Sequence, residues 1–365
     1  MAAVGPLIDC SMGCRFPQFP ARNGILWSSH EWRARVRRVL GAGAYYAGNM
    51  CAPETPFAYR RPEEAPEQGQ EGSADSVRSA KDEAGRKRKL EYPPAPEPLR
   101  VPVMDNHTHL NFRDGLVEVS VKDALDAAEA VGVKAAVQVA CDLESARFTV
   151  RALDEDRRLL GALAIHPNDA PLYAARGELE DALREIEDLA AHPRVRGIGE
   201  TGLDYFRTQG EEEQAIQHYS FRRHIDIARR LGLTLQIHDR DAHDDVVRIL
   251  LEEEQPPRVV FHCFSGDEAL AAICNEHGWY MSFAGPVGFK ANEHLRGALR
   301  TARRDLIMVE TDSPFLTPHP YRGRPNASYM IPYTMRSMAE ILDTDLEELC
   351  ADVARNTEAA YGSWD

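Results

Sequence analysis

The sequence predicts an α/β protein whose main body is one closed (β/α)8 barrel of the TIM type. From residue 101 onward, short apolar runs alternate with segments that have the apolar period of a helix. Eight such runs fit within the last 265 residues. Histidine and carboxylate side chains follow several of the runs on the same side, and barrels of this kind carry their sites at the carboxyl ends of the strands.

The expected elements alternate in order along the chain. The strands cover residues 101–105, 135–140, 159–165, 195–200, 233–238, 258–262, 279–284 and 306–311. The helices between them cover residues 121–131, 144–155, 178–191, 211–231, 243–253, 267–277 and 292–302, and further helices follow the last strand. Helices of this length between strands imply parallel βαβ units. Eight parallel strands favour a closed barrel over an open sheet.

A pair of histidines marks the end of the first strand. His107 and His109 follow the apolar run 101–104, and two side chains two residues apart on an extended chain point the same way. One such pair among 13 histidines is weak evidence for a metal site. Four later strands end in a potential ligand, namely Glu200, His238, His262 and Asp312. Six candidate ligands therefore lie at one end of the barrel.

Six ordered motifs make the chain resemble the TatD family of metal-dependent deoxyribonucleases, within the amidohydrolase-type barrels. They are Asp105-Asn106-His107-Thr108-His109, Ile165-His166-Pro167, Gly199-Glu200-Thr201-Gly202-Leu203-Asp204-Tyr205, His238-Asp239-Arg240-Asp241-Ala242, Phe261-His262-Cys263-Phe264-Ser265-Gly266 and the run from Glu310 to Pro318. Two positions depart from the family pattern. The run Arg324-Pro325-Asn326-Ala327-Ser328 lacks the usual Glu, and Leu110-Asn111 stands where Leu-Asp is usual. Both departures leave the substrate open.

The resemblance implies a centre with two divalent cations. His107, His109 and Asp312 would hold one ion, His238 and His262 would hold the other, and Glu200 would bridge them. Glu200 and Asp312 are the expected catalytic residues, with Asp312 taking or relaying a proton from water. Because the ligand atoms are oxygen and nitrogen, the site accepts Mg, Mn or Zn. No organic cofactor is expected.

A second group of residues is expected around these ligands. His166, Arg240 and Ser265 are candidates for substrate or phosphate binding, and Ser265 precedes a helix start that could seat an anion. A buried structural histidine remains the alternative for His166, and a structural ion pair with a carboxylate such as Asp204 remains the alternative for Arg240. Asp204 is expected to support the centre from outside, and Glu310 to orient Asp312 or a ligand histidine.

The first hundred residues differ in composition from the rest. Residues 1–97 are expected to form a low-complexity, largely disordered extension, and residues 98–365 the barrel, because the stretch 52–102 is rich in Pro, Glu, Gln, Gly and Ser. Deleting residues 1–97 is therefore expected to leave stability and activity nearly unchanged. The basic cluster 86–89 is interpreted as a solvated charge run, and the basic and apolar stretch 33–47 as a poor export signal.

Charge and cysteine usage limit the function. The net charge is −15, and residues 1–100 carry 15 basic and 12 acidic side chains, which leaves −18 on residues 101–365. A barrel this acidic, with no basic stripe, is not expected to bind duplex DNA tightly. Seven cysteines at irregular spacing indicate a reducing compartment, and no apolar run of 18 residues exists, so a cytoplasmic protein without a membrane span is expected.

The sequence therefore predicts a cytoplasmic hydrolase, a deoxyribonuclease that uses two metal ions to cleave phosphodiester bonds in DNA and trims single-stranded ends. The alternative within enzymes is an ester or amide hydrolase such as an aminoacyl-tRNA deacylase, since the same chemistry attacks acyl carbon. A barrel that only binds a partner is a third possibility, against which the complete ligand set argues.

Overall fold

The computed structural model describes residues 8–9, 15–16, 56–57, 81, 87–115 and 117–364. The chain divides into two compact units, residues 1–54 and 55–365. In the first unit, β1 (Ile8–Asp9) pairs antiparallel with β2 (Arg15–Phe16). The second unit contains the barrel. Most of the stretch expected to be disordered lies outside the described residues.

Eight parallel strands form one sheet in the sequence order β3 to β10. They are β3 (Val103–Thr108), β4 (Val133–Val139), β5 (Leu159–Leu163), β6 (Val195–Asp204), β7 (Thr234–Arg240), β8 (Val259–Phe261), β9 (Tyr280–Phe283) and β10 (Ile307–Val309). The segment after β10 closes the sheet onto β3, because Asp312 N donates to His107 O (2.9 Å) and His109 N donates to Ser313 O (2.8 Å). The predicted (β/α)8 barrel is confirmed.

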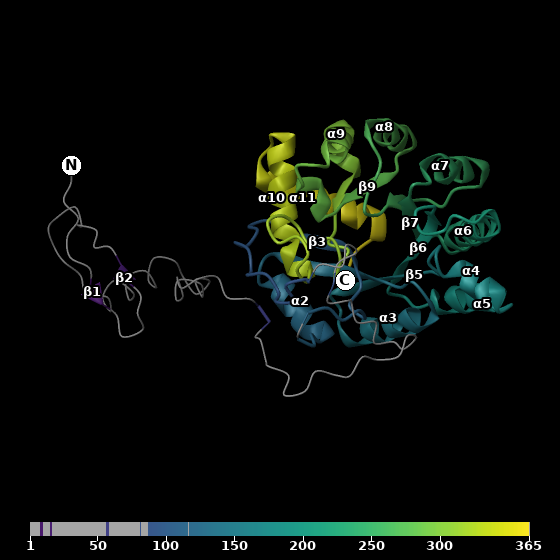
Figure 1. The fold of residues 1–365 in the computed structure, drawn as a ribbon, viewed down its shortest axis with the longest axis horizontal. Helices are drawn as coiled ribbons and strands as arrows, with labels where there is room; N and C mark the ends of the chain where they lie inside the picture. The colour runs from purple at the N-terminus through teal and green to yellow at the C-terminus, as the bar shows by residue number, and fades with distance from the viewer. Residues whose placement is uncertain are drawn as a thin grey trace. The chain divides into compact units, whose positions relative to one another are not determined.

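Helices follow one another around the strands (Figure 1). They are α2 (Val121–Glu129), α3 (Leu143–Glu155), α4 (Ala170–Ala175), α5 (Leu179–Leu189), α6 (Glu211–Leu231), α7 (His243–Glu252), α8 (Glu268–His277), α9 (Glu293–Thr301), α10 (Ile331–Leu342) and α11 (Leu346–Tyr361), with short 3-10 turns at Gly285–Gly288, Arg304–Leu306 and Ser328–Met330. Helix α4 was not expected from the sequence, since six residues are too few to give a periodic pattern. Within the described residues, no helix combines the length and apolar character that crossing a membrane requires.

Alternate residues of the strands form two packed layers. Val137 and Val139 of β4 and Leu160 and Ala162 of β5 belong to one buried cluster, which Tyr361 at the end of α11 joins. On the other face of the sheet, Ala136 of β4 and Leu159 and Leu163 of β5 pack with the helices in a larger cluster. This alternation follows from the two-residue period of a strand. The interior is therefore filled with side chains, and the strand ends rest on a rigid support.

Part of the expected extension packs against the barrel. Arg88 makes two hydrogen bonds to the carboxylate of Asp114, at 3.0 and 2.6 Å, and both side chains are almost fully buried. Arg324 donates to the backbone oxygen of Tyr92 (2.6 Å), and Tyr329 donates to that of Pro93 (2.6 Å). The expectation that the barrel starts only at residue 98 is therefore wrong for residues 88–97. We refer to residues 88–97 as the N-terminal strap.

Candidate metal centre

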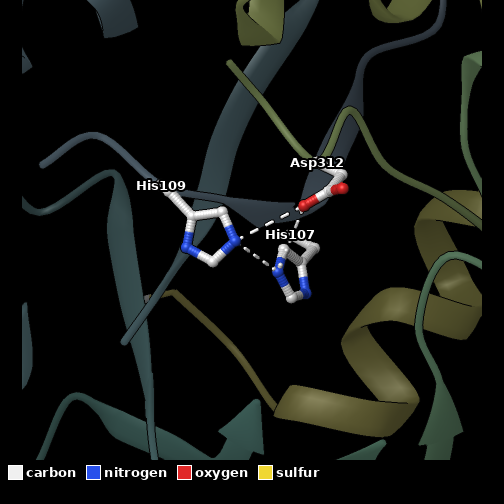
Figure 2. A group of neighbouring side chains, drawn as sticks. All are labelled: His107, His109 and Asp312. Carbon is white, nitrogen blue, oxygen red and sulfur yellow. Dashed lines mark hydrogen bonds and ion pairs between the residues drawn. The ribbon is translucent and has the colours of Figure 1, made fainter. Parts of the chain in front are cut away.

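The first group of ligands joins the end of β3 to the segment after β10. Nε2 of His107 lies 3.0 Å from Nε2 of His109, and these two atoms lie 3.6 and 3.4 Å from Oδ1 of Asp312. Figure 2 shows the three side chains converging on one point. Asp312 has a φ of 53°, a left-handed conformation that aspartate tolerates better than most residues. This backbone turn directs its carboxylate toward the two imidazoles.

Glu200 stands between this group and a second one. Its Oε2 lies 3.5 Å from Nε2 of His107 and 3.6 Å from Nε2 of His109. Its Oε1 lies 2.6 Å from Nδ1 of His238 and 2.9 Å from Nε2 of His262. One carboxylate therefore turns one oxygen to each histidine pair. This is the arrangement that a bridging carboxylate needs, and it brings together all six ligands expected from the sequence.

His166 also belongs to the second group. Its Nε2 lies 3.4 Å from Oε1 of Glu200, and its ring packs edge-on against that of His238 with centroids 4.6 Å apart. Its Nδ1 accepts a hydrogen bond from Asn168 N (3.1 Å). A nitrogen aimed at the shared carboxylate distinguishes His166 from a buried histidine that is satisfied by backbone alone. The structure thus places it at the centre and not in the surrounding core.

The spacing of the ligand atoms fits a metal ion. Four ligand atoms held tetrahedrally about 2.1 Å from one ion lie about 3.4 Å apart. Among the atoms of His107, His109, Asp312 and Glu200 Oε2, the five nitrogen–nitrogen and nitrogen–oxygen separations given above range from 3.0 to 3.6 Å. The nitrogen and oxygen donors suit Mg, Mn or Zn. His107, His109 and Asp312 could therefore hold a divalent cation, with Glu200 close to both histidines.

The electrostatics of the centre follow from its burial. Burial alone would raise the pKa of Glu200, but the imidazoles of His262 and His166 outweigh it and hold that pKa well below its usual range. Burial would likewise lower the pKa of His262, yet Glu200 and Glu310 raise it well above its usual value. The pKa of His107 is lowered by burial and by His262. Glu200 is thus ionised, and cations compete with protons for the histidines.

Three further carboxylates hold the ligands from behind. Glu310 Oε1 lies 3.1 Å from Nδ1 of His262 and accepts a hydrogen bond from Cys263 N (2.7 Å). Asp204 Oδ2 lies 3.3 Å from Nε2 of His238 and accepts from Asn168 Nδ2 (2.8 Å). Of the two partners considered for Glu310, the structure thus places it against a histidine. Such contacts fix the orientation of ligand imidazoles.

Asp105 is the third of these carboxylates, and sequence reasoning gave it no role. It is fully buried and accepts hydrogen bonds from Thr311 N (2.9 Å), Thr311 Oγ1 (2.6 Å) and His107 N (3.3 Å). Burial raises the pKa of Asp105 to about 7, although the hydrogen bonds from Thr311 act in the opposite direction. Asp105 therefore ties the strand of His107 to the segment of Asp312.

Arg240 and Ser265, both expected to bind phosphate, have different surroundings. The guanidinium of Arg240 stacks on the ring of Phe206, with Cζ 3.9 Å from the ring centroid, and its side chain makes no ion pair with Asp204 or any other described carboxylate. The hydroxyl of Ser265 donates to Asp239 O (2.7 Å). The start of α8 is capped by Asp267, which accepts from Ala269 N and Leu270 N. The carboxylate of Asp267 therefore occupies the amides of Ala269 and Leu270. Anion binding by the preceding N–H groups of Ser265 and Gly266 stays a prediction.

Cys141 and a neighbouring cavity were also missed. The Cys141 thiol lies 3.6 Å from Glu200 Oε2 and 3.9 Å from His109 Nδ1. Cys141 lies two residues after the end of β4, so its position near a strand end was a usable signal. Cys141 also lines a cavity of about 480 Å3, together with Asn111, Phe112, Asp114 and Tyr92 of the N-terminal strap. The cavity thus adjoins the first ligand group and is large enough for a small organic group.

A barrel that gathers imidazoles and carboxylates at its strand ends around one shared carboxylate is of the metal-dependent hydrolase class. Residues 104–362 match the model of the family described as TatD related DNase. A Mycobacterium tuberculosis protein named as the uncharacterized metal-dependent hydrolase TatD is 42% identical over 264 residues, which cover 71% of this chain and 98% of that protein. The uncharacterized metal-dependent hydrolase YabD of Bacillus subtilis is 32% identical, with 71% and 98% covered. The chain belongs to the TatD family of metal-dependent hydrolases.

Solved structures support the fold assignment. The TatD homolog YjjV of Escherichia coli superposes with a TM-score of 0.65 at 20% identity, covering 72% of this chain and 98% of that one. A TatD family hydrolase of Entamoeba histolytica gives a TM-score of 0.63 at 18% identity, with 73% and 100% covered. The family match begins at residue 104, so the N-terminal strap lies outside it. The predicted family is confirmed.

Proposed function

We propose that this chain uses two divalent cations to hydrolyse phosphodiester bonds in DNA, removing nucleotides from single-stranded ends in the cytoplasm. The observation that carries the proposal is that the two carboxylate oxygens of Glu200 face two different histidine pairs, because such a carboxylate could bridge two neighbouring ions. His107, His109 and Asp312 would hold one ion, His238 and His262 the other. When bound, two such ions supply Lewis acidity at the phosphoryl oxygens and acidify a water molecule.

The chain's own residues then have separate tasks. Asp312 faces both histidines through Oδ1, which leaves Oδ2 to accept the proton of the attacking water. Glu310 and Asp204 keep the rings of His262 and His238 in place. Arg240, two residues beyond His238, offers guanidinium N–H groups to a phosphate of the substrate.

The charge of the barrel supports an end-trimming activity on single strands. Residues 101–365 carry a net charge of −18, which disfavours a protein that tracks the backbone of a duplex. An enzyme that takes one strand end into a site where metal ions supply positive charge needs no basic stripe. The family's description as DNase agrees with DNA as the substrate.

The test is a product analysis on protein freed of metal by a chelator and then reloaded with Mg, Mn or Zn. We expect a single-stranded oligonucleotide labelled at one end to release mononucleotides in a metal-dependent reaction, faster than the corresponding duplex. Release of free amino acid from aminoacyl-tRNA, with oligonucleotides left intact, would replace the nuclease proposal by the deacylase alternative.

A further inference from the structure

Phe206 and Arg240 lie together just beyond the second group of ligands. In the parallel register of β6 and β7, Asp204 is opposite Arg240, and Tyr205 N donates to Arg240 O (2.9 Å). Phe206 therefore lies just after the end of β6. It is two residues past Asp204, whose carboxylate contacts His238. Both side chains are at the carboxyl ends of the strands, on the side of the barrel that carries the metal centre.

The two side chains form a stacked pair that is open to solvent. The guanidinium carbon of Arg240 lies 3.9 Å above the centroid of the Phe206 ring, which is van der Waals contact. Phe206 is 50% exposed, so burial in the core does not account for a large aromatic residue here. An arginine held flat against a ring has already lost much of its rotamer freedom, so less is lost when it binds a ligand.

The carboxylates of Asp204, opposite Arg240 in the sheet, and of Asp239, the residue before it, have other partners. Asp204 interacts with His238 and Asn168, and Asp239 lies 2.7 Å from Nδ1 of His243. In the described part of the chain, no side-chain hydrogen bond or ion pair engages the Arg240 guanidinium. Its N–H groups are therefore available to an acceptor that comes from outside the chain, while its flat face remains stacked.

We propose that Phe206 and Arg240 form a platform that stacks one unpaired base of the substrate strand and binds the adjoining phosphate through the edge of the guanidinium. The proposal rests on the proposed function and identifies the contact that would select single strands over duplexes. Aromatic rings and guanidinium planes stack on bases of any sequence, but only where a base has a free face. A base inside a duplex has both faces covered, so the platform favours single-stranded ends.

The experiment measures binding and cleavage of labelled single strands by the full chain. Binding is read by fluorescence anisotropy on a strand with phosphorothioate linkages, at one salt concentration because phosphate contacts depend on salt. Phe206→Ala is expected to weaken binding by about fivefold or more, the lower range for loss of one base stack. Phe206→Tyr keeps the ring and is expected to retain wild-type affinity. Arg240→Lys keeps the charge but not the plane, and is expected to weaken binding as well.

Leu251→Ala is the matched control. Leu251 is 52% exposed, like Phe206, but it lies near the end of α7, the helix that leads away from the strand ends. Its replacement is expected to leave binding unchanged. A loss of affinity in Leu251→Ala as large as in Phe206→Ala would overturn the proposal, because exposed apolar surface alone would then explain the binding.

A series of strands with one abasic nucleotide at successive positions from the end tests the stacking directly. At one position the ratio between wild-type and Phe206→Ala affinity is expected to fall toward one, since no base is left to stack. A constant ratio at every position would overturn the platform. If the wild type binds strands through Phe206 yet cleaves none, the platform stands and the nuclease proposal falls.

Discussion

Replacement of Arg88 by methionine tests whether the N-terminal strap is part of the folded barrel. The guanidinium makes a double hydrogen bond to Asp114, and the side-chain exposures of the two residues are 3% and 0%. Removing one partner of a buried ion pair costs about 3–5 kcal/mol of unfolding free energy. Gly115 N still donates to the carboxylate, at 2.8 Å, and offsets part of this cost.

We therefore expect Arg88→Met to lower the free energy of unfolding by about 3–4 kcal/mol at pH 7. The addition of Asp114→Asn to Arg88→Met is expected to recover part of the loss at pH 7, because it removes the buried charge.

The assay is urea unfolding at pH 7, with Arg100→Met as the matched control. Arg100 pairs with Glu347 at 3.2 Å, but their side chains are 87% and 50% exposed. An exposed pair of this kind contributes at most about 1 kcal/mol. Equal, small losses for Arg88→Met and Arg100→Met would refute a folded strap and would restore the expectation that residues 1–97 are dispensable.

Three further outcomes are expected. Glu200→Gln should reduce the bound metal, measured by elemental analysis, and lower hydrolysis by about a hundredfold or more; a variant with two ions and normal turnover would contradict the bridge. Mn at a hundred times its dissociation constant should raise the unfolding free energy by about 2.7 kcal/mol. The gain should be smaller at pH 5, where protons compete for the histidines. A gain that does not depend on pH would show that the ion binds away from these histidines. Burial lowers the pKa of His224 to about 4. As pH falls from 6.5 to 4, the free energy of unfolding should therefore decrease by up to about 3 kcal/mol. In urea unfolding across this pH range, His224→Gln should show a smaller decrease.

The ligands were predictable because each lies at a strand end. A strand with a two-residue period fixes which side chains share a face, and parallel strands bring their carboxyl ends together. His107 and Asp312 are therefore expected to meet although the sheet must close to bring them together. The family resemblance implied that Glu200 bridges the two groups, but which oxygen faces which histidines depends on side-chain rotamers that the sequence does not give.

The strap could not be predicted from its own composition. Residues 88–97 are rich in proline and poor in large apolar side chains, which predicts disorder. Their order comes from donors far along the chain, since Arg324, Tyr329 and Arg336 bind the backbone oxygens of Tyr92, Pro93 and Glu97. Composition measures the apolar surface that a segment can bury by itself. It carries no information about distant side chains that satisfy its carbonyl groups.

The capped start of α8 was, by contrast, visible in the sequence. Asp267 directly precedes the helix, and aspartate at this position caps the first amides. Because Asp267 occupies the amides of Ala269 and Leu270, a phosphate at this helix start would have to bind the preceding N–H groups of Ser265 and Gly266.

Asp114 connects the strap to the cavity beside the metal centre. This residue holds Arg88 and, like Tyr92, lines the cavity next to His109, on the opposite side of Glu200 from His238. The metal ligands lie within the residues that match the family, whereas this wall of the cavity includes a residue outside them. The ligands would fix the chemistry, whereas the cavity wall would limit the size of a group that binds beside them. A change in the strap should therefore affect substrate selectivity more than it affects metal binding.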